Sequence, residues 1–156
     1  MIMSVRGLLV LCCVGLTVGC STQLTVAVLG DPDMNRGGNA AVVKVYQLRA
    51  DGAFQGTPLS SFWQGDAEAL GSELVAPPRR LTVYPSASKT LTLEVADEAT
   101  FLGVAANLRA PDRGHWRAVR RLDGMGDRVS VLVEQSRIVV RAEEGRLPDV
   151  GIDVGR

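Results

Sequence analysis

Short runs of alternating apolar and polar residues, each ended by turn residues, constrain the fold of this chain more than any other feature. Alternation with a period of two places one set of side chains on a single face of a β-strand. Turn residues separate the runs at the spacing of an all-β sandwich. We therefore predict a two-sheet β-sandwich of about eight strands. The predicted strands cover residues 23–29, 41–48, 79–84, 90–95, 100–108, 116–122, 129–134 and 137–141.

Two of these runs and two of the turns carry further information. Residues 23–29 alternate cleanly, which indicates a strand with one buried face. Residues 41–48 are apolar on both faces and rich in β-branched side chains, which predicts a central strand covered on both sides. The sequence PSAS at 85–88 and the pair at 135–136 are each predicted to be hairpin connections.

The segment 57–76 lacks the period of two. Asp66 is a favourable helix N-cap residue, and two leucines that follow it lie four residues apart on one helical face. We expect one or two short helices here, inserted between strands. Phe62 and Trp63 are expected to attach this insertion to the sandwich.

Residues 1–19 are predicted to be an export signal. The apolar run at 7–18 is too short to span a hydrocarbon core of ~30 Å, which needs about 20 residues, but it fits the core of a signal peptide. The run ends in LTVGC, which is the lipobox pattern of bacterial lipoproteins, with Thr17 at a place usually held by Leu. A secretory signal that contains a cysteine by chance is the alternative.

Cysteine usage supports lipidation. Of the three cysteines, Cys12 and Cys13 lie within the predicted signal, so only Cys20 would remain in the mature protein. A lone cysteine cannot form an internal disulfide or a zinc site. Acyl chains on Cys20 would anchor the protein, since each buried CH₂ contributes about 0.8 kcal/mol. Ser21 after the cysteine predicts sorting to the outer membrane, by analogy with enteric lipoproteins.

The mature chain is predicted to comprise a lipidated domain at 20–142 and a flexible tail at 143–156. The charges of the full chain give no reason to expect a nucleic-acid partner, because 17 basic residues are balanced by 17 acidic ones. Its one histidine, His115, follows no nucleophile motif, and no glycine-rich phosphate loop follows a strand. We predict no enzyme activity, no catalytic residue, no cofactor and no small-molecule substrate.

The connection GDPDMNRGG, between the first two predicted strands, has the spacing of calcium ligands. Asp31, Asp33 and Asn35 would fill the first three ligand positions of an EF-hand loop. However, Arg36 stands where that loop needs glycine, and Val42 stands where it needs a bidentate glutamate. We therefore predict no metal site.

Two readings of this connection stay open, an ordinary polar turn and a protein-binding loop. The connection is longer than the ~2–5 residues of a usual hairpin loop. It also carries Met34, which we expect to be exposed, and the pair Gly37-Gly38. These features favour a binding loop.

Four motifs, in order from Cys20 to about Arg141, resemble those of the TssJ family, the small outer-membrane lipoproteins of type VI secretion systems. DPDMNRGGNAAVVKVYQL resembles the family's loop and the strand that follows it. FWQGDAEALGSEL resembles its helical insertion, FLGVAANLR one of its strands, and WRAV the start of another.

The resemblance implies a transthyretin-like β-sandwich that tethers the periplasmic domain of the inner-membrane protein TssM. It also implies that the first loop is the contact with TssM. That loop comprises Asp31, Pro32, Asp33, Met34, Asn35, Arg36, Gly37, Gly38 and Asn39. The family's usual prolines are replaced by the last three of these residues, so we expect a more flexible loop and a larger ordering cost on binding.

The alternative is a periplasm-facing lipoprotein that binds a ligand in a groove of the sandwich. An aromatic content of 4% argues against sugar binding, which stacks rings on exposed aromatics. Only Trp63 and Trp116 could offer an indole platform, and both are expected to be core anchors.

Overall fold

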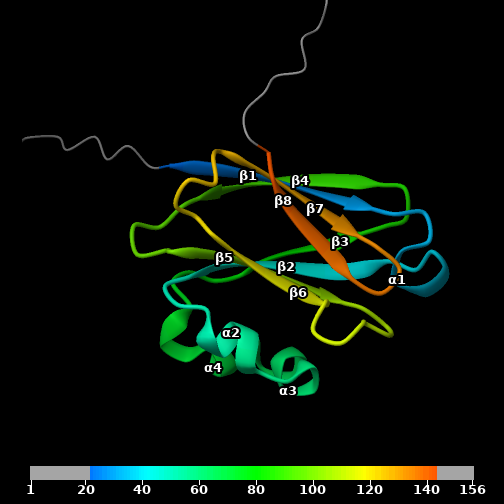
Figure 1. Ribbon diagram of the computed structural model, residues 1–156, viewed down its shortest axis with the longest axis horizontal. Coiled ribbons are helices and arrows are strands. Elements are labelled where there is room, and N and C mark those ends of the chain that lie inside the picture. The colour runs from blue at the N-terminus through cyan, green and yellow to red at the C-terminus, as the bar shows by residue number, and fades with distance from the viewer. Residues whose placement is uncertain (1–21, 144–156) are drawn as a thin grey trace, which may run out of the picture.

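The computed structural model describes residues 22–143, which form two four-stranded β-sheets packed face to face (Figure 1). The predicted all-β sandwich of eight strands is confirmed, and the ends of each strand differ from the prediction by at most two residues. The strands are β1 Gln23–Gly30, β2 Ala41–Leu48, β3 Arg79–Val83, β4 Ser88–Glu94, β5 Phe101–Asn107, β6 Arg117–Arg121, β7 Arg128–Val133 and β8 Ile138–Ala142.

The first strand lies inside its sheet, not at an edge. One sheet has the order β4-β1-β7-β8, and its β1–β7 pair is parallel. The other sheet has the order β3-β2-β5-β6, with every pair antiparallel. The hairpin predicted at 135–136 is confirmed by the antiparallel β7–β8 pair. The hairpin predicted at 85–88 is wrong, because β3 pairs with β2 and β4 pairs with β1, so this connection crosses between the sheets.

The space between the sheets is filled by the alternating apolar residues of the strands. On β1, Leu24, Val26 and Val28 are all buried, as the period of two predicts. Val43 and Val45 on β2 are buried as well. This core fixes the sandwich as a rigid support for its connecting loops.

A helical insertion covers the outer face of the β3-β2-β5-β6 sheet (Figure 1). It comprises α2 Gly52–Gly56, α3 Leu59–Gln64, α4 Asp66–Leu70 and the 3₁₀ turn η1 Gly71–Glu73. The insertion thus begins five residues before the predicted segment 57–76 and holds more helices than the one or two expected. The sequence GAFQG of α2 has no helical period, so tertiary packing of the fully buried Phe54 holds it in place.

Five of the seven aromatic side chains of the protein gather between this sheet and the insertion. Neighbouring rings meet at centroid distances of 5.1–6.5 Å, mostly edge to face. The cluster consists of Tyr46, Phe54, Phe62, Trp63 and Trp116. The predicted attachment of the insertion through Phe62 and Trp63 is confirmed.

Strand β2 is buried on both faces, as predicted. Its second face packs against the insertion through Tyr46 and Leu48, both fully buried. Gly103 pairs with Tyr46 on the neighbouring strand, and a Cβ there would lie 3.0 Å from atoms of Leu48 and Phe54. Glycine at this position therefore allows the insertion to approach the sheet closely.

We expected Asp66 to cap a helix, but it joins the insertion to β2 instead. Gly65 holds the N-cap position of α4, and Asp66 Oδ2 accepts hydrogen bonds from Lys44 Nζ at 2.6 Å and Tyr46 Oη at 2.7 Å. Burial by itself raises the pKa of the Asp66 carboxyl, but the bonds from Lys44 and Tyr46 outweigh it and lower the pKa below its usual value. Burial and the Asp66 carboxylate raise the pKa of Tyr46.

Among residues 22–143, no helix has the length and apolar character needed to cross a bilayer. The predicted signal peptide, the predicted lipidation site Cys20 and all of the predicted tail except residue 143 lie outside the described residues. Those three assignments stay predictions.

Candidate functional site

The connection between β1 and β2 lies at one end of the sandwich, on the right in Figure 1, where its short turn α1 (Met34–Gly37) is labelled. The connections β5–β6 and β7–β8 lie at the same end, whereas β1 begins at the opposite end (Figure 1). The three connections are also joined by hydrogen bonds, described below. They form one continuous surface at the end of a rigid sandwich.

The backbone of this connection turns with a left-handed twist. Four consecutive residues have positive φ: Asn35 at 49°, Arg36 at 54°, Gly37 at 82° and Gly38 at 78°. Glycine adopts this conformation freely and asparagine tolerates it, but it is costly for arginine. The two glycines that we expected to loosen the loop thus supply the left-handed backbone of a defined turn.

Asn35 holds the turn against the rest of the sandwich. The residue is only 3% exposed. Its Nδ2 donates to the carbonyl of Ala40 at 2.8 Å, and its Oδ1 accepts from the backbone N–H of Arg109 at 2.7 Å. Its own N–H donates to the carbonyl of Glu134 at 3.1 Å. The side chain of Asn35 therefore joins the β1–β2 and β5–β6 connections, and its backbone adds the β7–β8 connection.

Met34 is fully buried, so the prediction that it is exposed is wrong. Its side chain fills the space beside Gly30 at the end of β1. A Cβ on Gly30 would lie 2.6 Å from Met34 Sδ and would also collide with the carbonyl oxygen of Tyr84. Met34 therefore packs inward because Gly30 leaves room for it, which no pattern in the loop sequence indicates.

The nine loop residues that we predicted to bind a partner thus divide into two groups. Met34 and Asn35 are buried and organise the loop. The other seven are exposed or half-buried and are available to a partner: Asp31, Pro32, Asp33, Arg36, Gly37, Gly38 and Asn39.

A depression of about 460 Å³, beside Arg36, extends this surface beyond the predicted loop. Its lining also includes Ala110 and Asp112 from the β5–β6 connection, and Gln135 and Ser136 from the β7–β8 turn. Ser136 Oγ donates to Asp112 Oδ2 at 2.8 Å, which ties the two connections together. These residues could not be predicted from the sequence, because only the parallel β1–β7 pair brings the turn after β7 beside the loop after β1.

No arrangement suited to metal binding occurs in the described part of the chain, where no group of three or more His, Cys, Asp or Glu side chains comes together. Asp31 Oδ1 accepts from the backbone N–H of Asp33 at 3.0 Å, which is a turn contact. His115 is exposed, and its backbone joins Asp112 and Ile138. The geometry of these residues is that of loop structure.

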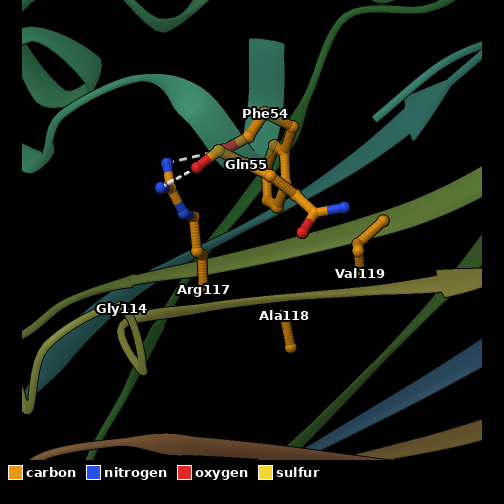
Figure 2. Close-up of a pocket in the computed structure, with 6 residues that line it drawn as sticks. All are labelled: Phe54, Gln55, Gly114, Arg117, Ala118 and Val119. Atoms are coloured by element: carbon orange, nitrogen blue, oxygen red, sulfur yellow. Dashed lines mark hydrogen bonds between the residues drawn. The ribbon is translucent and has the colours of Figure 1, made fainter. Parts of the chain in front are cut away.

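A second depression, of about 220 Å³, lies between α2 and β6. Figure 2 shows the guanidinium of Arg117 reaching the carbonyls at the end of α2. It donates to the carbonyls of Phe54 at 2.7 Å and Thr57 at 2.5 Å, and also to that of Gln55. Burial lowers the pKa of Arg117. Because these carbonyls occupy the guanidinium, this depression offers little to a ligand, and it does not favour the ligand-binding alternative.

Comparison with known proteins agrees with the architecture. The sequence matches, over residues 22–144, a family model described as type VI secretion lipoprotein, VasD, EvfM, TssJ. The search of curated proteins found no significant match.

Three similar solved structures share the fold. The T6SS lipoprotein TssJ1 from Pseudomonas aeruginosa is 18% identical, with a TM-score of 0.72 over 81% of this chain and 99% of that chain. Serratia marcescens Lip, described as a membrane bound component of the type VI secretion system, is 18% identical, with a TM-score of 0.71 over 80% and 99%. A chain in a structure described as T6SS protein TssM C-terminal domain (869-1107) from EAEC is 21% identical, with a TM-score of 0.65 over 81% and 98%.

Proposed function

The chain belongs to the type VI secretion lipoprotein family, and on that premise we propose that it is a lipid-anchored outer-membrane subunit that docks the periplasmic domain of TssM. This family is one of secretion-system lipoproteins and not an enzyme family. The observation that carries the proposal is the β1–β2 connection, which is held in one conformation by Asn35 and presents charged side chains to solvent. A preorganised loop on a rigid support binds a partner at a lower entropic cost.

The comparison structures support TssM as the partner. In the structure described as the TssM C-terminal domain, the match covers 81% of this 156-residue chain and 98% of the matched chain. The matched chain therefore has about 130 residues. That length is well short of the interval 869–1107, and it fits a smaller companion chain better than the named fragment. A chain with this fold in a structure described as the TssM C-terminal domain is what a docking role predicts.

The position of the anchor supports the direction of docking. Cys20 precedes the first residue of β1 by three positions, and the loop follows the last. The eight residues of β1 span about 25 Å at ~3.3 Å per residue. Acyl chains on Cys20 would therefore hold one end of the sandwich at the membrane and direct the loop into the periplasm.

Replacing Cys20 by Ser tests the anchor. We expect the Cys20→Ser variant to be folded and to fractionate with soluble periplasmic proteins, because it lacks the residue that would carry the acyl chains. Circular dichroism checks the fold, and membrane fractionation checks the location. Recovery of the variant with outer membranes, at the level of the unchanged protein, would contradict lipidation at Cys20.

Charge removal in the loop tests docking. We expect Asp33→Ala combined with Arg36→Ala to weaken binding to the periplasmic fragment of TssM in a titration, without lowering the unfolding temperature. The matched control is Arg79→Ala combined with Glu98→Ala, which also removes one basic and one acidic exposed side chain, but away from this loop. If the loop variant and the control bind TssM equally well, the interface lies elsewhere.

A further inference from the structure

Arg36 has a backbone conformation that favours glycine over arginine. Its φ is 54° and its ψ is 83°, and the two residues after it are glycines with positive φ. A left-handed conformation is costly for a residue with a Cβ, and such outliers are concentrated at functional sites. Arginine at this position therefore needs a reason beyond the fold of the loop.

Arg36 contributes to the fold through its backbone and not through its side chain. Its N–H donates to the carbonyl of Gln135 at 3.1 Å, and its carbonyl accepts from Asn39 Nδ2 at 2.7 Å. These two bonds are available to any residue at this position. Within residues 22–143, the exposed guanidinium takes part in no hydrogen bond or salt bridge, although acidic side chains lie in the same loops.

The acidic groups on the neighbouring connections are already engaged. Glu134 forms a salt bridge with Arg137, and Asp112 accepts from Ser136. The guanidinium is thus a free fork of donors at the edge of the 460 Å³ depression. A carboxylate is the group that best matches such a fork, because it can accept two parallel hydrogen bonds.

We propose that the depression between the β1–β2 connection and the β7–β8 turn is a pocket for an acidic side chain of the docking partner, and that Arg36 selects it. The inference rests on the proposed docking of TssM and adds the chemistry of recognition. The backbone bonds to Gln135 and Asn39 fix where the side chain starts, so less order is lost on binding.

Asp112 allows the charge of the bound group to be tested. Its carboxylate also lines the pocket, and it repels an incoming acidic group but attracts a basic one. Asp112→Asn removes the charge and keeps an oxygen that can accept from Ser136. An acidic ligand predicts that Arg36 and Asp112 variants shift the affinity in opposite directions.

The experiment is a titration of the detergent-solubilised mature lipoprotein with the periplasmic fragment of TssM from the same secretion system. We expect Arg36→Gly to weaken binding by about tenfold or more, as for loss of a close charge pair, and to leave the unfolding temperature unchanged or higher. We expect Asp112→Asn to tighten binding. The control is Arg113→Gly, which removes an exposed arginine from the β5–β6 connection that does not line the pocket, and which should bind as the unchanged protein does.

The outcomes separate the two proposals. If the unchanged protein binds TssM and Arg36→Gly binds equally well, the pocket is wrong and the docking proposal stands. If Asp112→Asn weakens binding, the pocket takes a basic or amide group and the inference is overturned. If Arg36→Gly lowers the unfolding temperature together with the affinity, the arginine is structural and the inference again fails. If the unchanged protein does not bind TssM, both proposals fail.

Discussion

Replacing Asn35 by Ala would remove the side chain that joins the β1–β2 and β5–β6 connections of the candidate site. The change leaves the N–H of Arg109 and the carbonyl of Ala40 without their partners in a partly buried region. Each lost partner costs about 1 kcal/mol or more, and alanine at φ 49° adds about 1 kcal/mol relative to asparagine. The free energy of unfolding should therefore fall by about 3 kcal/mol.

For a domain of this size, that loss lowers the unfolding temperature by about 10 °C. The assay is thermal unfolding followed by circular dichroism, on the soluble Cys20→Ser form of the protein. Asn35→Gly should lose less, because glycine adopts the left-handed backbone and only the hydrogen bonds disappear. Asn107→Ala, at an exposed strand end, is the control and should change little. An unfolding temperature for Asn35→Ala within about 2 °C of the unchanged protein would refute the reasoning.

Two further predictions concern the helical insertion. Arg117→Met should lower the free energy of unfolding by about 2 kcal/mol, because three carbonyls at the end of α2 lose their donor, while TssM affinity stays unchanged; urea denaturation and the titration check both. Asp66→Asn should cost about 1 kcal/mol at pH 7, and this difference should shrink as the pH falls through the range in which Asp66 takes up its proton. The sign follows from the lowered pKa of Asp66, whose stabilisation is present above the unfolded-state pKa and is lost as the pH falls through the folded-state pKa. Urea denaturation at pH 7 and pH 3 measures it, with Glu68→Gln in the same helix as the control; a difference that grew in acid would contradict the assignment.

Strand content could be predicted from the sequence because each strand carries its own signal. The run at 41–48 is apolar on both faces, and β2 is indeed covered by the other sheet on one side and by the insertion on the other. That pattern depends only on where each side chain points. It does not depend on which strands become neighbours.

Strand pairing and loop packing could not be predicted in the same way, because they depend on partners distant in sequence. The connection at 85–88 has hairpin-like residues, but its flanking strands pair in different sheets. Asp66 is a favourable helix N-cap residue, but Lys44 and Tyr46 donate hydrogen bonds to its carboxylate. Met34 was predicted to be exposed, but a glycine four residues earlier opens the space that buries it. In each case a tertiary contact overrides a local preference.

The place of β1 in its sheet has a mechanical consequence. In the sequence, the single strand β1 lies between Cys20, the proposed anchor, and the loop proposed to hold the partner. A pull between membrane and partner would therefore run straight along β1, with no other element in series. That strand is bonded on both sides, through seven paired residues to β4 and six to β7. Force along the axis of β1 loads both hydrogen-bond ladders in shear, so their bonds must break together and not one at a time. The sandwich should therefore resist extraction of β1 under tension.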